Sequence, residues 1–217
     1  MKGGKGKMNY KRFPLGGLWT NGYLFYDESG DAFFVDPGGD AQEVFDFAEL
    51  NKINIKAVLL THGHLDHLAG IESFIPLVGD AIYISDADSP YLKRPPEDMQ
   101  RALGMTSRGA EKFKTIADGD VLSNIAGGFE VKVIATPGHT PGSVCYVVKR
   151  GDELLVSGDT LFAQSVGRTD LPGGDERQLM ESILKLSKLP DDLEVLPGHG
   201  PTTNIARERK SNPFWPR

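Results

Sequence analysis

The sequence predicts a layered α/β protein in which helices lie outside β-sheets. Strand-like and helical runs follow one another in the order ββα and then in further αβ and ββ units, which is typical of layered folds. The chain has 217 residues, enough for one compact domain with a sizeable core, and no Ser/Gly-rich or charge-dense linker divides it. We therefore expect a single domain over residues 9–217.

The N-terminal segment is expected to lie outside this domain. Residues 1–8 are rich in Lys and Gly and cannot bury an apolar face, so we expect them to be disordered. No apolar stretch is long enough for a signal peptide or a membrane span, which predicts a cytoplasmic protein with no membrane partner. The formal net charge of −6 gives no general attraction to phosphate backbones, so we expect no nucleic-acid partner.

The domain is expected to open with an antiparallel hairpin, since the polar turn 27–31 joins the strand-like runs 22–26 and 32–35. Residues 40–52 then place apolar side chains at helical spacing, with Asp40 as the expected N-cap. Further strands are expected at 56–60, 81–85, 129–135, 144–149, 153–156 and 194–196, and a second helix at 176–186.

Two stretches depart from this regular order. Segment 86–116 contains three prolines among scattered charges, and we expect short helices there, over one edge of a sheet. The only cysteine, Cys145, lies in the apolar run 143–148, which excludes a disulfide framework and predicts a buried strand thiol.

The most informative pattern is a short apolar strand that ends in a loop carrying His or Asp. All five histidines occur in this pattern, together with two aspartates: His62, His64, Asp66, His67, His139, Asp159 and His199. His62 and His64 are two residues apart, so in extended backbone both point to the same side. Asp66 and His67 follow where a helix can begin, and we expect them to face a second position beside the first.

Imidazole nitrogens and carboxylate oxygens suit zinc, and also iron or manganese. Seven ligands are enough for two divalent ions. Our hypothesis assigns one ion to His62, His64 and His139, the other to Asp66, His67 and His199, and makes Asp159 the bridge. A hydroxide shared by the two ions would be a strong nucleophile at neutral pH, which predicts a hydrolase. Asp36 also follows a strand; it either holds a ligand loop from outside the metal centre or forms a turn.

These residues resemble the metallo-β-lactamase superfamily. Its signature His-x-His-x-Asp-His is matched by residues 62–67, and its downstream ligands are matched in order by His139, Asp159 and His199. The resemblance implies a four-layer αββα sandwich with the metal site at one edge of the two sheets. Within the superfamily, the motifs at 35–40, 137–142 and 166–170 resemble short single-domain glyoxalase II proteins, which are hydroxyacylglutathione hydrolases. The implied substrate is a small-molecule thioester such as S-lactoylglutathione, attacked by the bridging hydroxide.

The chain departs from the full-length glyoxalase II pattern at the substrate side. It ends at Arg217, without the helical extension that supplies contacts to glutathione, and Pro201 stands where that pattern has a tyrosine. Arg168 keeps a basic position, whereas Asp170 replaces a second tyrosine. Arg168 is therefore either a substrate-binding residue or the partner of Asp170 in a charge pair.

The resemblance also bears on catalysis and on rival functions. Asp66 and Asp159 are the expected catalytic carboxylates, since they hold the ions and Asp66 can also orient the hydroxide. The main alternative is a persulfide dioxygenase, which would use one iron held by His62, His139 and Asp159. A third alternative is a metal-binding module without catalysis. Phe214 and Trp215 are expected either to cap an apolar patch or to form the contact of a homo-oligomer.

Overall fold

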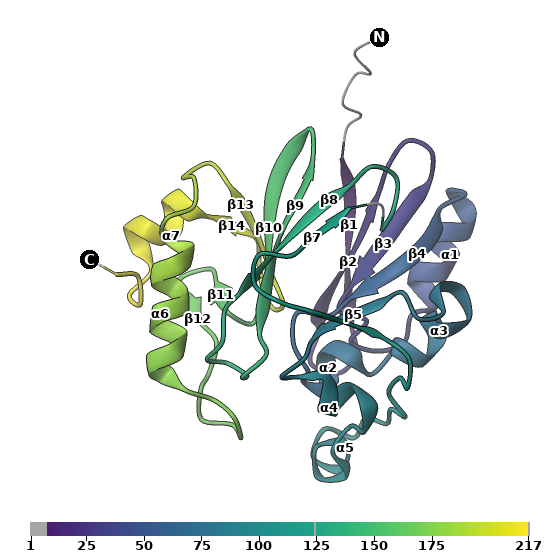
Figure 1. Cartoon of the computed structure of the whole chain (residues 1–217), viewed down its shortest axis with the longest axis horizontal. Helices are drawn as coiled ribbons and strands as arrows, with labels where there is room; N and C mark the ends of the chain where they lie inside the picture. Colours follow the sequence, from purple (N-terminus) through teal and green to yellow (C-terminus); the bar gives the residue numbers. More distant parts are fainter. Residues whose placement is uncertain (1–7, 124, 217) are drawn as a thin grey trace.

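The computed structural model describes residues 8–123 and 125–216 and contains two six-stranded sheets packed face to face, with helices on both outer sides (Figure 1). The expected αββα sandwich is therefore confirmed. Of the segment expected to be disordered, residues 1–7 lie outside the described residues, while Met8 is half-buried and packs against the core between the sheets.

The first sheet has the strand order β1-β2-β3-β4-β5-β6. Its strands are β1 Asn9–Leu15, β2 Thr20–Tyr26, β3 Asp31–Val35, β4 Asn54–Leu59, β5 Ile82–Ser85 and β6 Lys114–Ile116. The first three strands pair antiparallel, and β3 to β6 pair parallel. Strand β1 was not predicted, because its exposed Lys11 and Arg12 hide the apolar alternation of an edge strand.

The second sheet has the strand order β14-β13-β10-β9-β8-β7. Its strands are β7 Val121–Ser123, β8 Glu130–Ala135, β9 Val144–Arg150, β10 Asp152–Gly158, β13 Glu194–Pro197 and β14 Thr203–Asn204. Strands β10 and β13 are parallel, and β9 is antiparallel to both β8 and β10. The carboxyl ends of β8, β10 and β13 therefore lie at the same edge of the sheet. A separate hairpin, β11 Leu161–Phe162 with β12 Ser165–Val166, follows β10.

The helices fall into two groups (Figure 1). On the side of the first sheet are α1 Gln42–Leu50, α2 Leu65–Leu68, α3 Ile71–Val78, α4 Ser89–Lys93 and α5 Glu97–Leu103; on the side of the second are α6 Glu176–Leu186 and α7 Ile205–Ser211. The short helices expected in segment 86–116 are thus present as α4 and α5. The N-cap of α1 is Ala41, one residue after the expected Asp40, yet the Asp40 carboxylate still accepts a hydrogen bond from the backbone N–H of Gln42, the first residue of the helix.

Three apolar layers hold the sandwich together. Alternate residues of β2 face opposite ways, so that Leu24 packs toward α1 and α3 while Tyr23 and Phe25 pack between the sheets. The third layer lies between the second sheet and α6 and α7, and it contains Cys145 and Trp215. Cys145 is fully buried in β9, which confirms the expected buried strand thiol, and burial raises the pKa of that thiol to about 11. Trp19, in contrast, is 75% exposed in the turn between β1 and β2.

No helix in the described part of the chain is long and apolar enough to cross a membrane.

Candidate metal centre

All seven predicted ligands come together where four strands end. The loop after β4 and the short helix α2 carry His62, His64, Asp66 and His67. The other three ligands follow β8, β10 and β13, one after each strand. Because parallel strands bring their carboxyl ends to one edge, residues more than 130 positions apart converge on this point.

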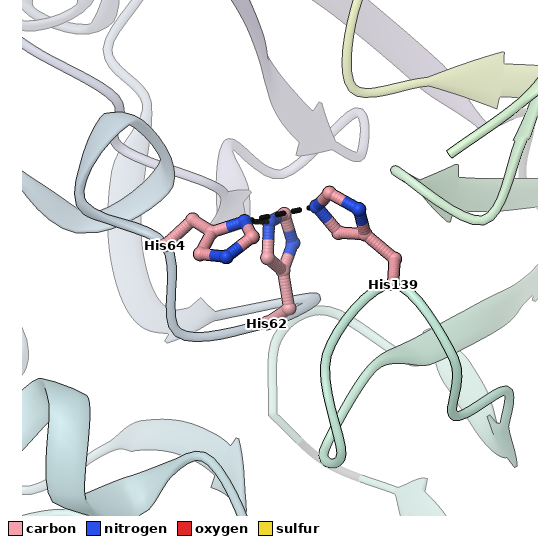
Figure 2. A group of neighbouring side chains, drawn as sticks. All are labelled: His62, His64 and His139. Carbon is pink, nitrogen blue, oxygen red and sulfur yellow. Dashed lines mark hydrogen bonds between the residues drawn. The ribbon is translucent and has the colours of Figure 1, made fainter. Parts of the chain in front are cut away.

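The first ligand group consists of His62, His64 and His139. Their rings point toward one another from two loops (Figure 2). Nδ1 of His64 lies 3.1 Å from Nε2 of His62 and 2.9 Å from Nε2 of His139. Ligand atoms at about 2.0–2.1 Å from a tetrahedral ion lie roughly 3.3 Å apart, so this spacing suits one metal ion.

The second group consists of Asp66, His67 and His199. Nε2 of His199 lies 3.4 Å from Nε2 of His67 and 3.3 Å from Oδ2 of Asp66, which in turn lies 3.6 Å from Nε2 of His67. The hydroxyl of Thr20 donates to the same Asp66 oxygen at 3.2 Å, which orients the carboxylate. The three ligand atoms thus suit a second ion.

Asp159 lies between the two groups. Its Oδ1 is 3.4 Å from Nε2 of His67, and its Oδ2 is 3.6 Å from Nε2 of His139 and 3.5 Å from Nε2 of His199. Oδ1 is buried and finds no hydrogen-bond partner among residues 8–123 and 125–216. A buried carboxylate oxygen without a donor is costly unless a cation neutralises it, so the donor set fits a bridged pair of metal ions.

Hydrogen bonds fix which nitrogen of His62, His67 and His139 faces the centre. Nδ1 of His139 donates to the backbone carbonyl of Arg168 at 2.7 Å, and Nδ1 of His67 donates to Oδ2 of Asp36 at 2.9 Å. The hydroxyl of Thr61 donates to Asp36 at 2.6 Å, so it accepts from Nδ1 of His62 at 3.1 Å. All three Nε2 lone pairs therefore point inward, as a metal requires. Asp36 holds the ligand loop, one of the two roles considered for it.

Sequence reasoning missed Asp88, which lies in the proline-containing segment 86–116. This carboxylate is fully buried, and its Oδ2 accepts from the backbone N–H of Gly63 at 2.8 Å and from the hydroxyl of Thr140 at 2.6 Å. Its Oδ1 accepts from the N–H of Gly142 at 2.8 Å. Asp88 thereby joins the loop of His62 and His64 to the loop of His139. Only the fold reveals this role, because the three hydrogen-bond partners lie 25 to 54 residues away in the sequence.

Glycines allow the loops to approach this closely. A Cβ on Gly198 would lie 2.2 Å from Oδ1 of Asp159 and 2.7 Å from the His67 ring. Gly158 has φ +49, a conformation that favours glycine, and a Cβ there would lie 2.5 Å from the Thr61 hydroxyl. Any side chain at these positions would push the ligands apart.

The electrostatics of the centre favour neutral His62 and His64 and a positive charge beside the carboxylates. Burial, together with the neighbouring histidines, lowers the pKa of His62 well below its usual value and that of His64 to about 4, so both are neutral near pH 7. Burial also lowers the pKa of His67, but the charges of Asp159, Asp66 and Asp36 outweigh it and raise that pKa well above its usual value. These carboxylates favour a positive charge at this position, which a divalent cation satisfies.

A cleft of about 650 Å³ opens onto the ligands. Arg168 lines it and makes a bidentate ion pair with Asp170, with Nε and Nη2 each 2.7 Å from a carboxylate oxygen. The position of Arg168 is thus compatible with both expected roles, substrate binding and a charge pair with Asp170. Phe162 also lines the cleft and lies 6.3 Å from the His199 ring. Tyr23, by contrast, is buried and donates to the carbonyl of Pro197.

Comparisons with known proteins agree with this geometry. The family model of the metallo-beta-lactamase superfamily matches residues 15–199. Hydroxyacylglutathione hydrolase GloC of Haemophilus influenzae is 34% identical over 212 residues, which cover 95% of this chain and 98% of that protein. Two solved structures superpose with a TM-score of 0.84. One, BLEG-1 B3 metallo-beta-lactamase, is 36% identical and covers 95% of this chain and 99% of that one. The other, TTHA1623 in a di-iron-bound form, is 31% identical, and the match covers 94% of this chain and 99% of that chain.

Proposed function

The chain belongs to the metallo-β-lactamase superfamily, and on that premise we propose that this metal-dependent hydrolase is a thioesterase of the glyoxalase II type. Its substrates would be S-acyl thioesters, of which S-lactoylglutathione is the hydroxyacyl example. The observation that carries the proposal is the arrangement of seven ligands in two groups that share Asp159. The name of the Haemophilus influenzae relative, a hydroxyacylglutathione hydrolase, supports the substrate class.

We propose that His62, His64 and His139 hold one divalent ion, that Asp66, His67 and His199 hold the second, and that Asp159 bridges them. Two such ions lower the pKa of a shared water toward about 7 and polarise a carbonyl oxygen. Zinc, iron and manganese all suit imidazole and carboxylate ligands. Zinc is our first expectation, and the di-iron form of TTHA1623 supports iron as the alternative.

The residues of the chain contribute mainly by orientation. Asp36, Thr61 and the carbonyl of Arg168 keep the inward nitrogens of His67, His62 and His139 free of protons. Asp66, held by Thr20, presents its carboxylate at the floor of the cleft, where it would orient the attacking water. The departing thiolate has an ordinary pKa near 8.5, so it needs little help from a general acid. Arg168, at the wall of the cleft, would contact the polar part of the substrate.

The test is a side-by-side assay of the purified, metal-loaded protein on S-lactoylglutathione, simple acyl thioesters, a lactone and a β-lactam, together with elemental analysis. We expect close to two ions per chain and the highest kcat/KM on thioesters. The His139→Ala variant should lose both metal and activity, whereas Leu184→Ser, a surface change on α6, should retain both. Faster hydrolysis of the β-lactam or the lactone than of every thioester would refute the proposal.

The rival chemistry, persulfide oxidation by one iron, predicts different measurements. It needs only His62, His139 and Asp159, whereas the complete second group of Asp66, His67 and His199 supports two ions. About one iron per chain, combined with oxygen uptake on glutathione persulfide and no thioester cleavage, would favour the dioxygenase instead.

A further inference from the structure

The two walls of the cleft differ in chemistry, and this difference bears on the substrate. Lining residues contributed from the side of the first sheet are Leu18, Asp98, Met99, Ala102 and Leu103, apart from the metal ligands. Lining residues from the side of the second sheet are Phe162, Ser165, Val166, Arg168, Leu171 and Pro172. Arg168 is the single cation among the described residues that line the cleft, and it belongs to the second wall.

The first wall is built around helix α5. Met99, Ala102 and Leu103 have the spacing i, i+3 and i+4, which places them on one face of the helix. Met99 and Leu103 are half-buried, packed on one side against the core and open on the other side to the cleft. We call Leu18, Met99, Ala102 and Leu103 the apolar wall.

The apolar wall combines a turn and a helix that lie close together. Leu18 belongs to the turn between β1 and β2, and a Cβ on Gly16, in the same turn, would lie 3.3 Å from the end of Met105, just after α5. Leu18 itself keeps 49% of its surface exposed. A turn and a helix thus converge on the ligands and leave apolar surface open beside the reacting centre, where a substrate group would cover it.

We propose that the apolar wall binds the acyl group of the substrate, so that thioesters with an apolar acyl chain of several carbons react faster than short hydroxyacyl thioesters. This inference rests on the proposed thioesterase function. Asp98 and Asp66 would repel a carboxylate at this wall, whereas Arg168 on the opposite wall suits a polar thiol carrier. The acyl chain therefore takes the first wall and the carrier takes the second.

The test uses a series of N-acetylcysteamine thioesters, which share one uncharged carrier and differ only in the acyl group: lactoyl, butyryl, hexanoyl and octanoyl. Each buried methylene should raise kcat/KM about threefold, so octanoyl, with four more methylenes, should exceed butyryl by on the order of 80-fold. A kcat/KM that stays flat or falls along this series would overturn the proposal.

Two matched variants distinguish a loss of binding at the apolar wall from a general effect of replacing an exposed leucine by serine. Leu18→Ser should flatten the dependence of kcat/KM on acyl-chain length, because it removes apolar surface from the wall. Leu184→Ser, on α6 and equally exposed at 49%, should leave the whole series unchanged. If Leu18→Ser kept the full dependence on chain length, the wall would not be the binding surface.

A binding measurement keeps this proposal distinct from the proposed reaction. If the metal-loaded protein cleaves none of the thioesters, the thioesterase function fails, yet the apolar wall is still tested by calorimetry with the uncharged amides butanamide and octanamide. Octanamide should bind at least about tenfold more tightly than butanamide, and Leu18→Ser should remove that difference. Equal affinities would overturn the inference whatever the enzyme activity.

Discussion

The two sheets supply the metal centre in contrasting ways. The first sheet delivers four proposed ligands from one continuous stretch, His62 to His67, which comprises the loop after β4 and the start of α2. The second sheet delivers His139, Asp159 and His199 from three separate loops, each after a different strand. The first half of the centre is therefore a local structure, whereas the second half exists only if three strands keep their register.

Hydrogen bonds between the sheets align these two halves. The backbone N–H of Val144 donates to the backbone carbonyl of Thr61 at 2.8 Å. The hydroxyl of Tyr146 donates to the backbone carbonyl of Leu60 at 2.6 Å. On the other side, the backbone N–H of Asn21 donates to the carbonyl of Gly198 at 2.7 Å. Asp88 also links the two halves, because its buried carboxylate accepts hydrogen bonds from the loop of His62 and His64 and from the loop of His139. The comparison shows that the local half, the continuous stretch His62 to His67, only has to be positioned against the second sheet. The three loops of the second sheet, the dispersed half, must first be brought together by the pairing of their strands.

Asp159→Ala should have the largest effect, because this residue of the dispersed half serves both ligand groups. We expect kcat/KM for a thioester to fall at least about 1000-fold, equivalent to roughly 4 kcal/mol of transition-state stabilisation. Elemental analysis should show both ions depleted. The comparison variant His64→Ala lies in the local half and touches one group, so it should keep the second ion. Equal metal contents in the two variants would contradict a bridging role for Asp159.

Asp88→Asn should have the second largest effect on the metal centre. It weakens the hydrogen bonds that join the two ligand loops without removing a proposed ligand. Asparagine presents an N–H where the N–H of Gly142 needs an acceptor, so that donor loses its partner. We expect about a 10–100-fold loss of affinity for the ion held by His62, His64 and His139, and a much smaller change for the other ion. Stepwise chelator titration of the cobalt-loaded protein resolves the two affinities.

The control for that prediction is Asp27→Asn, which changes a buried carboxylate in the turn between β2 and β3, outside the metal centre. It should leave both metal affinities unchanged. If Asp88→Asn lowered both affinities equally, Asp88 would stabilise the fold in general rather than position the first ligand group.

Tyr146→Phe should have an intermediate effect on stability. The substitution removes the hydroxyl that reaches across to Leu60 and leaves a buried carbonyl without its donor, which costs about 2 kcal/mol in the free energy of unfolding. Urea unfolding of the metal-free protein measures this loss. A value near zero would mean that the cross-sheet bond contributes little to the alignment of the two halves.

The smallest effect concerns pH and the turn between β2 and β3. Burial raises the pKa of Asp27, but hydrogen bonds from Ser29 and Asp31 and the charge of Arg150 outweigh it and lower that pKa below its usual value. A lowered folded-state pKa means that the ionised carboxylate stabilises the fold above about pH 4, and that this stability is lost as the pH falls through the folded-state pKa.

Asp27→Asn should therefore cost about 1 kcal/mol at neutral pH and flatten the loss of stability in acid. Urea midpoints between about pH 3 and 7 measure both effects. An unchanged acid profile in the variant would show that other carboxylates control acid unfolding.

The sequence alone determined the layered fold and singled out the seven proposed ligands. Strand and helix periodicity persists through most of the chain, and each proposed ligand lies in a segment that follows a strand, so local pattern was sufficient to select them. Helix α3 escaped prediction because its run from Ile71 to Val78 is largely apolar and contains Pro76, which disguises helical periodicity. The edge strand β1 escaped because its charged residues interrupt the apolar alternation.

Only the tertiary structure decided how these residues cooperate. Asp88 holds two ligand loops through partners 25 to 54 residues away, and the apolar wall combines a turn near the N-terminus with helix α5. Hydrogen-bond geometry and the two-sided exposure of a helix depend on which segments become neighbours in space. A sequence records which donors, acceptors and apolar groups exist, whereas the packing of the two sheets determines which of them meet.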